Sequence, residues 1–261
     1  MASYLITGTS RGIGLETVRQ LLERPVEEVS KIVAVTRNNS SEALNALVSK
    51  SQGRIVNVII SDVTDEDKVQ ASIDSQSKTP SDPMASMYEL VVLINNAGIG
   101  DWTPGGVAAL KAAKLQEVFN ADVISAHLVT STLLPLLKAG QQRKIINIST
   151  PVGSMAYAQR FAFAPAPAYK IAKAAMNMWH TTYALDLKEE GFTVLAVSPG
   201  WLRTDMGTQD ADLDVDVGVA GVLDWVFKAE PSLNGKFVNI KVPGWENAPG
   251  MNQYDGKEIP W

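Results

Sequence analysis

The 261-residue sequence contains no cysteine and only two histidines, His127 and His180. Without thiols there can be no disulfide and no thiolate metal site. Both histidines fall in helical stretches, so we interpret them as structural and expect no metal. No apolar run approaches the roughly 18 residues that cross a membrane. The net charge of −5 comes without a basic stripe, which argues against nucleic acid as a partner.

The amino-terminal residues run directly into a strand-like segment and show no basic and apolar leader, so we expect a cytoplasmic protein. Apolar strand-like runs then alternate with helical stretches. The predicted strands are 3–7, 31–36, 54–60, 89–94, 144–148, 192–197 and 236–241. The predicted helices are 13–24, 41–50, 65–77, 110–137, 169–190 and 215–228. This alternation predicts a parallel sheet covered on both faces, and the absence of a linker indicates one domain, 1–261.

A glycine-rich turn lies between the first predicted strand and the first predicted helix. Glycines there allow a tight turn and let an anion approach the backbone N–H groups at a helix N-terminus. The position in the chain makes this a stronger signal than glycines alone. We predict a nucleotide site formed by Gly8, Ser10, Arg11, Gly12, Ile13 and Gly14.

The second predicted strand ends at Thr36, and Arg37 and Asn38 follow it. A cofactor with a free ribose 2′-hydroxyl favours an acidic residue at this point, whereas arginine suits a 2′-phosphate. With Arg11 in the glycine turn, Arg37 therefore favours NADP(H) over NAD(H). The alternative is that Arg37 is merely an exposed residue at a strand end.

Two further strand ends carry candidate cofactor residues. Asp62 and Val63 follow the third strand, where the carboxylate could accept a hydrogen bond from an adenine amine or simply cap the next helix. Asn96, Ala97 and Gly98 follow the fourth strand, where small residues allow a ligand to approach the backbone. The tetrapeptide 95–98 could also be an ordinary turn.

Tyr169 and Lys173 lie four positions apart in a segment of strong helix formers. On a helix this spacing places both side chains on one face. A cation beside a phenol favours the phenolate and lowers a tyrosine pKa from about 10, which suits the phenol to proton transfer. Taken alone, the pair could equally be a surface feature of an amphipathic helix.

Together these motifs resemble the short-chain dehydrogenase/reductase family. The matching features are Thr7-Gly8-x-x-x-Gly12-x-Gly14, Asp62-Val63, Asn95-Asn96-Ala97-Gly98, Asn120, Asn147-Ile148-Ser149-Thr150, Tyr169-x-x-x-Lys173, and Ser198-Pro199-Gly200 with Thr204. They cover nearly the whole chain. The segment 199–207 and the ending 254–261 are closer to sniffer-type carbonyl reductases and fungal norsolorinic acid ketoreductase-like enzymes.

The resemblance implies a Rossmann-type, doubly wound, three-layer fold with seven parallel strands, and hydride transfer between a nicotinamide and a carbonyl carbon. It makes Tyr169 the general acid and Lys173 its pKa-lowering, ribose-binding partner. It also implies that Asn120 binds a water molecule that links Lys173 to solvent. It also places a further set of residues beside the nicotinamide: Pro199, Gly200, Leu202 and Thr204. The resemblance also implies that the protein forms a homodimer or a homotetramer.

One position departs from the family pattern. A serine hydroxyl is usual at the end of the fifth strand, where this chain has Thr150 preceded by Ser149. Neighbours on a strand point to opposite sides, so Ser149 is not expected to substitute. Threonine keeps a donor hydroxyl but adds a methyl group and a stiffer side chain. We expect Thr150 to position the substrate carbonyl.

Three segments are expected to form the substrate side: 151–167, 201–218 and 241–252. The first is apolar and aromatic, which suits an aromatic ligand, or else it packs on a neighbouring subunit. The second carries Asp210, Asp212, Asp214 and Asp216 and is either a lid or a solvated flap. The favoured function is NADPH-dependent reduction of a carbonyl group on a hydrophobic, aromatic or polyketide-like molecule. The alternatives are reduction of a conjugated double bond, an acid/base cyclase or epimerase, and a non-catalytic NADP(H) sensor.

Overall fold

The computed structural model describes residues 2–76 and 90–261. Its seven strands form one sheet in the order β3-β2-β1-β4-β5-β6-β7. The strands are β1 Ala2–Thr7, β2 Val29–Thr36, β3 Ile55–Ile59, β4 Leu90–Asn95, β5 Lys144–Ile148, β6 Thr193–Ser198 and β7 Phe237–Asn239. The pairs β1–β2, β1–β4, β2–β3 and β6–β7 are parallel. The predicted Rossmann-type parallel α/β fold is confirmed.

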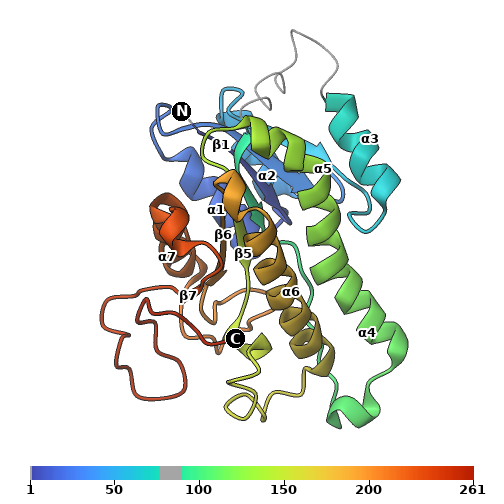
Figure 1. Ribbon diagram of the computed structural model, residues 1–261, viewed down its shortest axis with the longest axis vertical. Coiled ribbons are helices and arrows are strands. Elements are labelled where there is room, and N and C mark those ends of the chain that lie inside the picture. Colours follow the sequence, from blue (N-terminus) through green and yellow to red (C-terminus); the bar gives the residue numbers. More distant parts are fainter. Residues whose placement is uncertain (1, 77–89) are drawn as a thin grey trace. The chain divides into compact units, whose positions relative to one another are not determined.

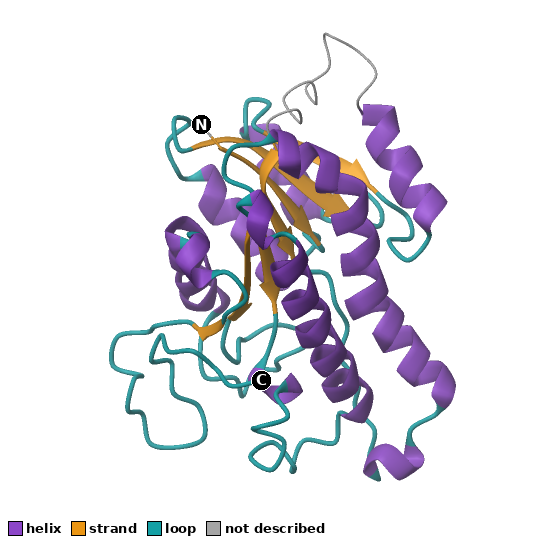
Figure 2. Cartoon of the chain, viewed as in Figure 1, coloured by secondary structure: helices purple, strands orange, loops and turns teal. Residues whose placement is uncertain are grey.

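The helices alternate with the strands along the chain, and Figure 2 distinguishes the two by colour. They are α1 Gly12–Leu22, α2 Glu42–Lys50, α3 Glu66–Gln76, α4 Ala112–Phe119, α5 Ser125–Ala139, α6 Pro167–Asp186 and α7 Val215–Lys228. Shorter turns are η2 Gly106–Ala109, η3 Asn120–Ile124, η4 Pro151–Gly153, η5 Lys188–Glu190 and η6 Pro231–Leu233. The predicted helix end at Ser77 and strand start at Glu89 lie outside the described residues. Within the described part, no helix is both long and apolar enough to cross a membrane.

The chain divides into two compact units. Unit 1 comprises Met1–Ala97 and Ser125–Ile145, and unit 2 comprises Gly98–Ile124 and Ile146–Trp261. The expectation of a single domain remains a prediction, and the two units are described separately below.

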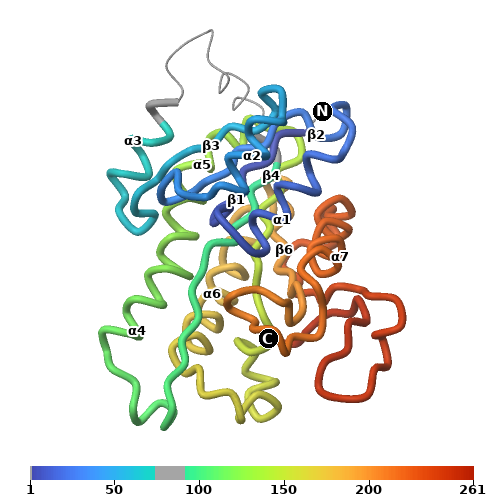
Figure 3. Tube along the Cα trace, turned by 180° about the vertical axis from the view of Figure 1, so that it is seen from behind, coloured from blue at the N-terminus to red at the C-terminus, as the bar shows by residue number. Residues whose placement is uncertain are grey.

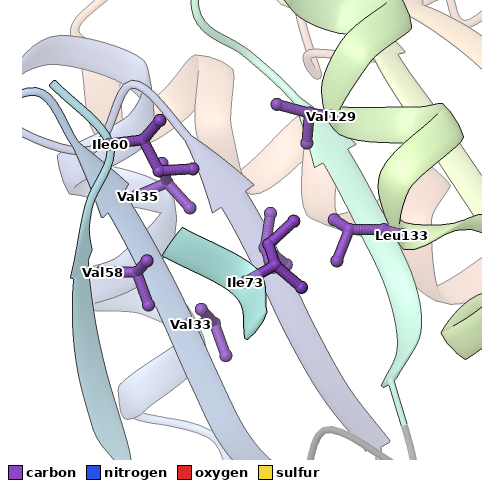
Figure 4. A pocket seen from close by; sticks show the side chains of 8 residues that line it. Val33, Val35, Val58, Ile60, Ile73, Val129 and Leu133 are labelled. Atoms are coloured by element: carbon purple, nitrogen blue, oxygen red, sulfur yellow. The ribbon is translucent and has the colours of Figure 1, made fainter. Parts of the chain in front are cut away.

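Unit 1 is built on strands β1 to β4, whose side chains are largely buried because helices pack against them. Helices α1 and α2 contact each other and the strands β1, β2 and β3, and α5 packs on β4 and α3. The interior encloses an apolar void of about 10 Å³, lined by Val33, Val58, Ile73 and Leu133 among others (Figure 4). A void this small with no polar lining is a packing defect and not a ligand site.

Unit 2 is organised around α6, which packs on β6, η4 and α4. Figure 1 shows α4 and α6 side by side. Viewed from behind, the chain leaves β4 in an extended trace before it turns into α4 (Figure 3). Pro167 begins α6, at a position where the missing N–H costs nothing. Gly191, with φ of 77°, closes the turn that follows.

The predicted helix 110–137 is interrupted in the structure. Helix α4 ends at Phe119, the π-helical turn η3 spans Asn120–Ile124, and α5 continues from Ser125. A π turn inserts an extra residue and changes which side chains face inward, and such turns are frequent at functional sites. Here η3 directs Asp122 into the interior, where its exposed fraction is 0%.

Candidate active site

Tyr169 lies in the first turn of α6, where the backbone is fixed from outside the helix. Its N–H donates to the carboxylate Oδ1 of Asp101 at 2.7 Å, and Asp101 Oδ2 accepts from the Thr103 hydroxyl at 2.9 Å. An acidic acceptor at a helix N-terminus satisfies an otherwise unpaired N–H and complements the helix dipole. The side-chain hydroxyl of Tyr169 makes no hydrogen bond with any residue that the structure describes.

Lys173 lies one turn after Tyr169, on the same face of α6. Its Nζ is 5.6 Å from the centroid of the Tyr169 ring, so the predicted pairing is present. The lysine is 5% exposed, and its ammonium donates to the backbone oxygen of Ile148 at 3.2 Å. The same ammonium lies 3.2 Å from the carboxylate Oδ2 of Asp122. A buried ammonium is tolerated because this carboxylate and this carbonyl replace its hydration.

Asp122 is the site residue that the sequence interpretation missed. Its Oδ1 accepts the N–H of Ile99 at 2.8 Å, while Oδ2 faces Lys173. Asn120, the predicted partner of Lys173, begins η3 instead, and its side chain makes no hydrogen bond in the described part of the chain. The usable signal was an aspartate within an apolar stretch, because buried carboxylates occur almost only where a partner is present.

The electrostatics of the tyrosine differ from the expectation. Burial raises the pKa of Tyr169 above its ordinary value of 10.0; the Lys173 charge lowers it, and the Asp122 charge raises it further. The Lys173 charge therefore lowers the Tyr169 pKa as predicted, but burial and the Asp122 charge together raise it by more. Burial lowers the pKa of Lys173, but the charges of Asp122 and Tyr169 more than compensate, so its pKa is raised overall. In the free protein both groups hold their protons at neutral pH.

Thr150 and Ser149 point to different environments, as strand alternation predicts. The Ser149 hydroxyl is buried and donates to Asn177 Oδ1 at 2.7 Å. The Thr150 oxygen accepts the N–H of Val152 at 3.3 Å, at the start of η4. That contact uses the oxygen as an acceptor, so the Thr150 proton remains available to donate.

The glycine turn of unit 1 has the geometry of an anion cradle. Gly8 and Gly12 have φ of 73° and 56°, values that L side chains rarely adopt. A Cβ on Gly14 would collide with the backbone oxygen of Gly8, so glycine is needed for the close approach. The turn leads into α1, whose first residues include Gly12 and Ile13. These features fit the phosphates of a dinucleotide.

The other predicted residues of unit 1 lie at the carboxyl ends of its strands. Ser10, Arg11, Arg37 and Asn38 are exposed, and the Asn38 side chain accepts from Ser40 N at 3.1 Å. Asp62 accepts from the backbone N–H and the hydroxyl of Thr64 at 2.9 and 2.7 Å, and these hydrogen bonds lower its pKa. Asp62 therefore closes a local turn and does not cap α3, whose capping carboxylate is Asp65, which accepts the N–H of Lys68 at 3.1 Å. Val63 is half-buried.

Asn96 and Ala97 are fixed against the glycine turn within unit 1. Both backbone N–H groups donate to the hydroxyl of Thr7 at 3.0 Å, and Asn96 Nδ2 donates to the Thr7 carbonyl at 2.8 Å. A Cβ on Gly8 would lie 2.9 Å from the Ala97 Cα. These contacts join the ends of β1 and β4, so the motif is a structural clamp as well as a candidate ligand surface.

The residues predicted beside the nicotinamide belong to unit 2 and follow β6. Gly200 has φ of 88°, and a Cβ there would lie 3.0 Å from the ring of Tyr254. Leu202 is buried, and the Thr204 hydroxyl accepts the N–H of Gly207 at 3.1 Å. Pro199 precedes this turn, and its carbonyl lies against the position where a Cβ on Gly218 would fall.

The segment 151–167 is a folded aromatic loop. Lys170 of α6 donates to the Phe161 carbonyl at 2.6 Å, and the Arg160 guanidinium lies 5.3 Å from the Tyr157 ring centroid. Phe163 is exposed. An open hollow of about 400 Å³ adjoins this loop, lined by Gly106, Val107, Ala162, Ala164, Pro165, Pro167 and Lys170.

The segments 201–218 and 241–252 are held together through Asp212. Its carboxylate accepts from the Tyr254 hydroxyl at 2.5 Å and from Asn252 at 2.7 Å. Asp214 pairs with Arg203 at 2.8 Å. Asp212 and Asp214 of the predicted lid therefore have structural partners. No group of three or more metal-binding side chains occurs among the described residues.

Two curated proteins illustrate the relationships of the sequence. The chain is 33% identical to the C-signal protein of Myxococcus xanthus over 171 residues, covering 65% of this chain and 92% of that protein. It is 27% identical to the norsolorinic acid ketoreductase of Aspergillus parasiticus over 271 residues, covering 99% of this chain and 90% of that one.

Two solved structures share the fold over the full length. The NADPH-bound carbonyl reductase from chicken fatty liver has a TM-score of 0.84 at 29% identity, covering 100% of this chain and 99% of that one. The carbonyl reductase Sniffer of Drosophila melanogaster has a TM-score of 0.84 at 27% identity, covering 100% of both chains. The sequence model described as short chain dehydrogenase matches residues 3–213. The chain therefore belongs to the short-chain dehydrogenase/reductase family of oxidoreductases.

Proposed function

We propose that this protein catalyses the NADPH-dependent reduction of a carbonyl group on a hydrophobic, aromatic or polyketide-like small molecule. The observation that carries the proposal is the placement of Tyr169 and Lys173 on one face of α6, with the Lys173 ammonium 5.6 Å from the tyrosine ring. The NADPH-bound carbonyl reductase of matching fold and the similarity to a norsolorinic acid ketoreductase support the reaction type.

Each unit, taken by itself, carries candidate cofactor residues. In unit 1 the turn Gly8–Gly14 would bind the pyrophosphate, while Arg11 and Arg37 would pair with a 2′-phosphate. In unit 2, Lys173 would hold the nicotinamide ribose, and the loop from Pro199 to Thr204 would border the nicotinamide. When bound, the reduced dinucleotide supplies the hydride that the carbonyl carbon accepts.

The proton comes from the protein. Tyr169 donates its phenolic proton to the carbonyl oxygen as negative charge develops there, so that the ketone becomes an alcohol and Tyr169 becomes a phenolate. The Lys173 charge stabilises that phenolate. Thr150 donates a hydrogen bond to the same carbonyl oxygen and orients it. Because burial raises the pKa of Tyr169, the tyrosine is in its proton-donating form at neutral pH, as reduction requires.

The substrate class is inferred from the aromatic loop. Tyr157, Phe161 and Phe163 lie in 151–167, and the nearby hollow of about 400 Å³ is of the size that accommodates small organic ligands. The hollow itself is lined by small and apolar side chains and Lys170. Among the loop aromatics Phe163 is exposed, and an exposed aromatic ring favours an aromatic ligand through offset or edge-to-face contacts. Cofactor turnover separates a silent NADP(H) sensor from the enzymatic functions. Product analysis separates carbonyl reduction from double-bond reduction and from an acid/base cyclase or epimerase.

We also propose a homodimer or homotetramer. Ile171, Met178 and Leu185 recur at seven-residue intervals on α6 and are 41%, 64% and 68% exposed. Seven residues are close to two helical turns, so these apolar side chains share one exposed face. Light scattering of the purified protein measures the assembly.

The test is NADPH consumption against a panel of aromatic ketones, quinones and enones, with NADH in parallel and products identified. Wild type is compared with Tyr169→Phe, which keeps the ring and removes only the proton donor. We expect alcohol formation with NADPH and at least a roughly 100-fold loss in the variant. A saturated ketone from an enone would support double-bond reduction. NADPH binding without turnover of any compound would favour the sensor.

A further inference from the structure

The most unusual group in unit 2 is a carboxylate in its interior. Asp122 lies in the π turn η3, between apolar neighbours, and is 0% exposed. Removing a carboxylate from water is costly unless a charge and hydrogen bonds replace its hydration. Its placement therefore requires specific partners.

Both carboxylate oxygens are directed at parts of the candidate site. Oδ1 accepts the Ile99 N–H at 2.8 Å, and Oδ2 lies 3.2 Å from Lys173 Nζ. A Cβ on Gly98 would lie 2.9 Å from Oδ1, so the glycine leaves room for the carboxylate. Asp122 thus connects the backbone after β4 to the lysine on α6.

We propose that Asp122 is a positioning residue of the Tyr169–Lys173 pair, whose buried negative charge fixes the Lys173 ammonium and opposes the loss of a proton from the pair. This inference rests on the proposed function. An asparagine of the same shape could accept the Ile99 N–H but could not supply the charge, so the role belongs to the carboxylate.

The charge balance supports this role. With Tyr169 neutral, Lys173 charged and Asp122 ionised, the three groups sum to zero. Replacing Asp122 with a neutral amide leaves a net buried positive charge, which eases loss of the first proton from the pair, whichever group releases it. In agreement, Asp122 contributes to the raised pKa of both Lys173 and Tyr169.

Other titratable groups do not replace Asp122. The elements β6 and η4 that pack on α6 carry none, and on α4 Lys114 pairs with Glu117 at the surface. Along α6 itself, His180 is buried and its pKa is lowered to about 4, so it is uncharged at neutral pH. The η5 charges follow the far end of α6. Asp101 contacts the backbone of Tyr169, and its carboxylate has no contact with Lys173.

The decisive experiment is the pH profile of kcat/KM for carbonyl reduction by wild type and Asp122→Asn. We expect the alkaline midpoint of kcat/KM to fall by about one pH unit or more in the variant. When each profile is scaled to its own value at neutral pH, kcat/KM at a pH above both midpoints should then be about tenfold lower in the variant than in the wild type. Asp101→Asn is the matched control, because it removes a nearby carboxylate from the same unit and should leave the midpoint in place. Superimposable profiles for wild type and Asp122→Asn would overturn the proposal.

A second readout does not depend on turnover. The thermal midpoints of Lys173→Met, Asp122→Asn and the double variant form a double-mutant cycle. Lys173→Met leaves a buried carboxylate without its charged partner. Adding Asp122→Asn should therefore raise the thermal midpoint of the Lys173→Met variant. Additive losses would overturn the inference whether or not the protein reduces carbonyls. If the two substitutions are not additive but the protein turns over no substrate, the proposed function is refuted, while the pairing of Asp122 with Lys173 is still supported.

Discussion

The Tyr254 hydroxyl donates a hydrogen bond of 2.5 Å to Asp212 and accepts the N–H of Trp201 at 3.2 Å. Tyr254 is 3% exposed, and burial together with the Asp212 carboxylate raises its pKa. The hydroxyl therefore keeps its proton, and its hydrogen bond to Asp212, at neutral pH. This one side chain holds both ends of the loop 201–212 against the segment after residue 241.

We expect Tyr254→Phe to lower the free energy of unfolding by about 1–3 kcal/mol, because Asp212 loses a partner in a partly buried place. Urea unfolding measures the loss, and limited proteolysis should cut within 201–214 faster. Tyr157→Phe is the control, since the Tyr157 hydroxyl makes no hydrogen bond in the described part of the chain. Equal stability of both variants would show that the Tyr254 contact is not a structural tie.

The hydroxyl of Thr150 should matter more than its methyl group. Thr150→Val keeps the shape, removes the donor and should lower kcat/KM about 100-fold, corresponding to roughly 3 kcal/mol. Thr150→Ser should keep most of the activity. Ser149→Ala, which breaks the buried bond to Asn177, should reduce stability more than catalysis. A fully active Thr150→Val enzyme would exclude the assigned role.

Arg37 should determine the choice of cofactor. Arg37→Ala is expected to weaken NADPH binding about tenfold or more and leave NADH binding nearly unchanged, because only NADPH carries the 2′-phosphate. Fluorescence titration gives both dissociation constants. The control is Lys31→Ala, which removes an equal charge from strand β2, the strand that ends one residue before Arg37. Lys31 Nζ donates to the Gly53 carbonyl at 2.8 Å. A parallel loss for both cofactors would contradict the prediction.

The buried histidine should make stability depend on acid pH. His180 Nδ1 lies 3.0 Å from Asn147 Nδ2, and burial lowers the His180 pKa from 6.5 to about 4. Between these values the unfolded chain binds a proton that the folded chain does not, so stability falls as pH falls. The loss by pH 4 is about 3 kcal/mol.

Urea unfolding between pH 4 and 7 tests this dependence. His180→Gln should flatten the decline by that amount. The slope against pH is compared, and the absolute stability is not. His127→Gln, which changes the exposed histidine, should retain the wild-type slope. An unchanged slope for His180→Gln would assign the acid dependence to other groups.

Much of the site follows from local sequence. The Tyr169–Lys173 spacing places two side chains on one helical face wherever the helix packs, and the Gly8–Gly14 turn requires glycine conformations that few other residues adopt. The strand alternation that sends Ser149 and Thr150 to different sides is also local. These features depend on the backbone geometry of a few neighbouring residues, and for that reason they were predictable.

The sequence by itself determined the parallel α/β fold, the family and the glycine, tyrosine and lysine motifs. Only the tertiary structure decided that Asp122 pairs with Lys173, because the π turn directs this side chain into the interior. It also decided that the pKa of Tyr169 is raised, because burial and a carboxylate far away in sequence outweigh the lysine. Local spacing encodes which groups can meet, whereas burial and net charge are sums over the whole fold.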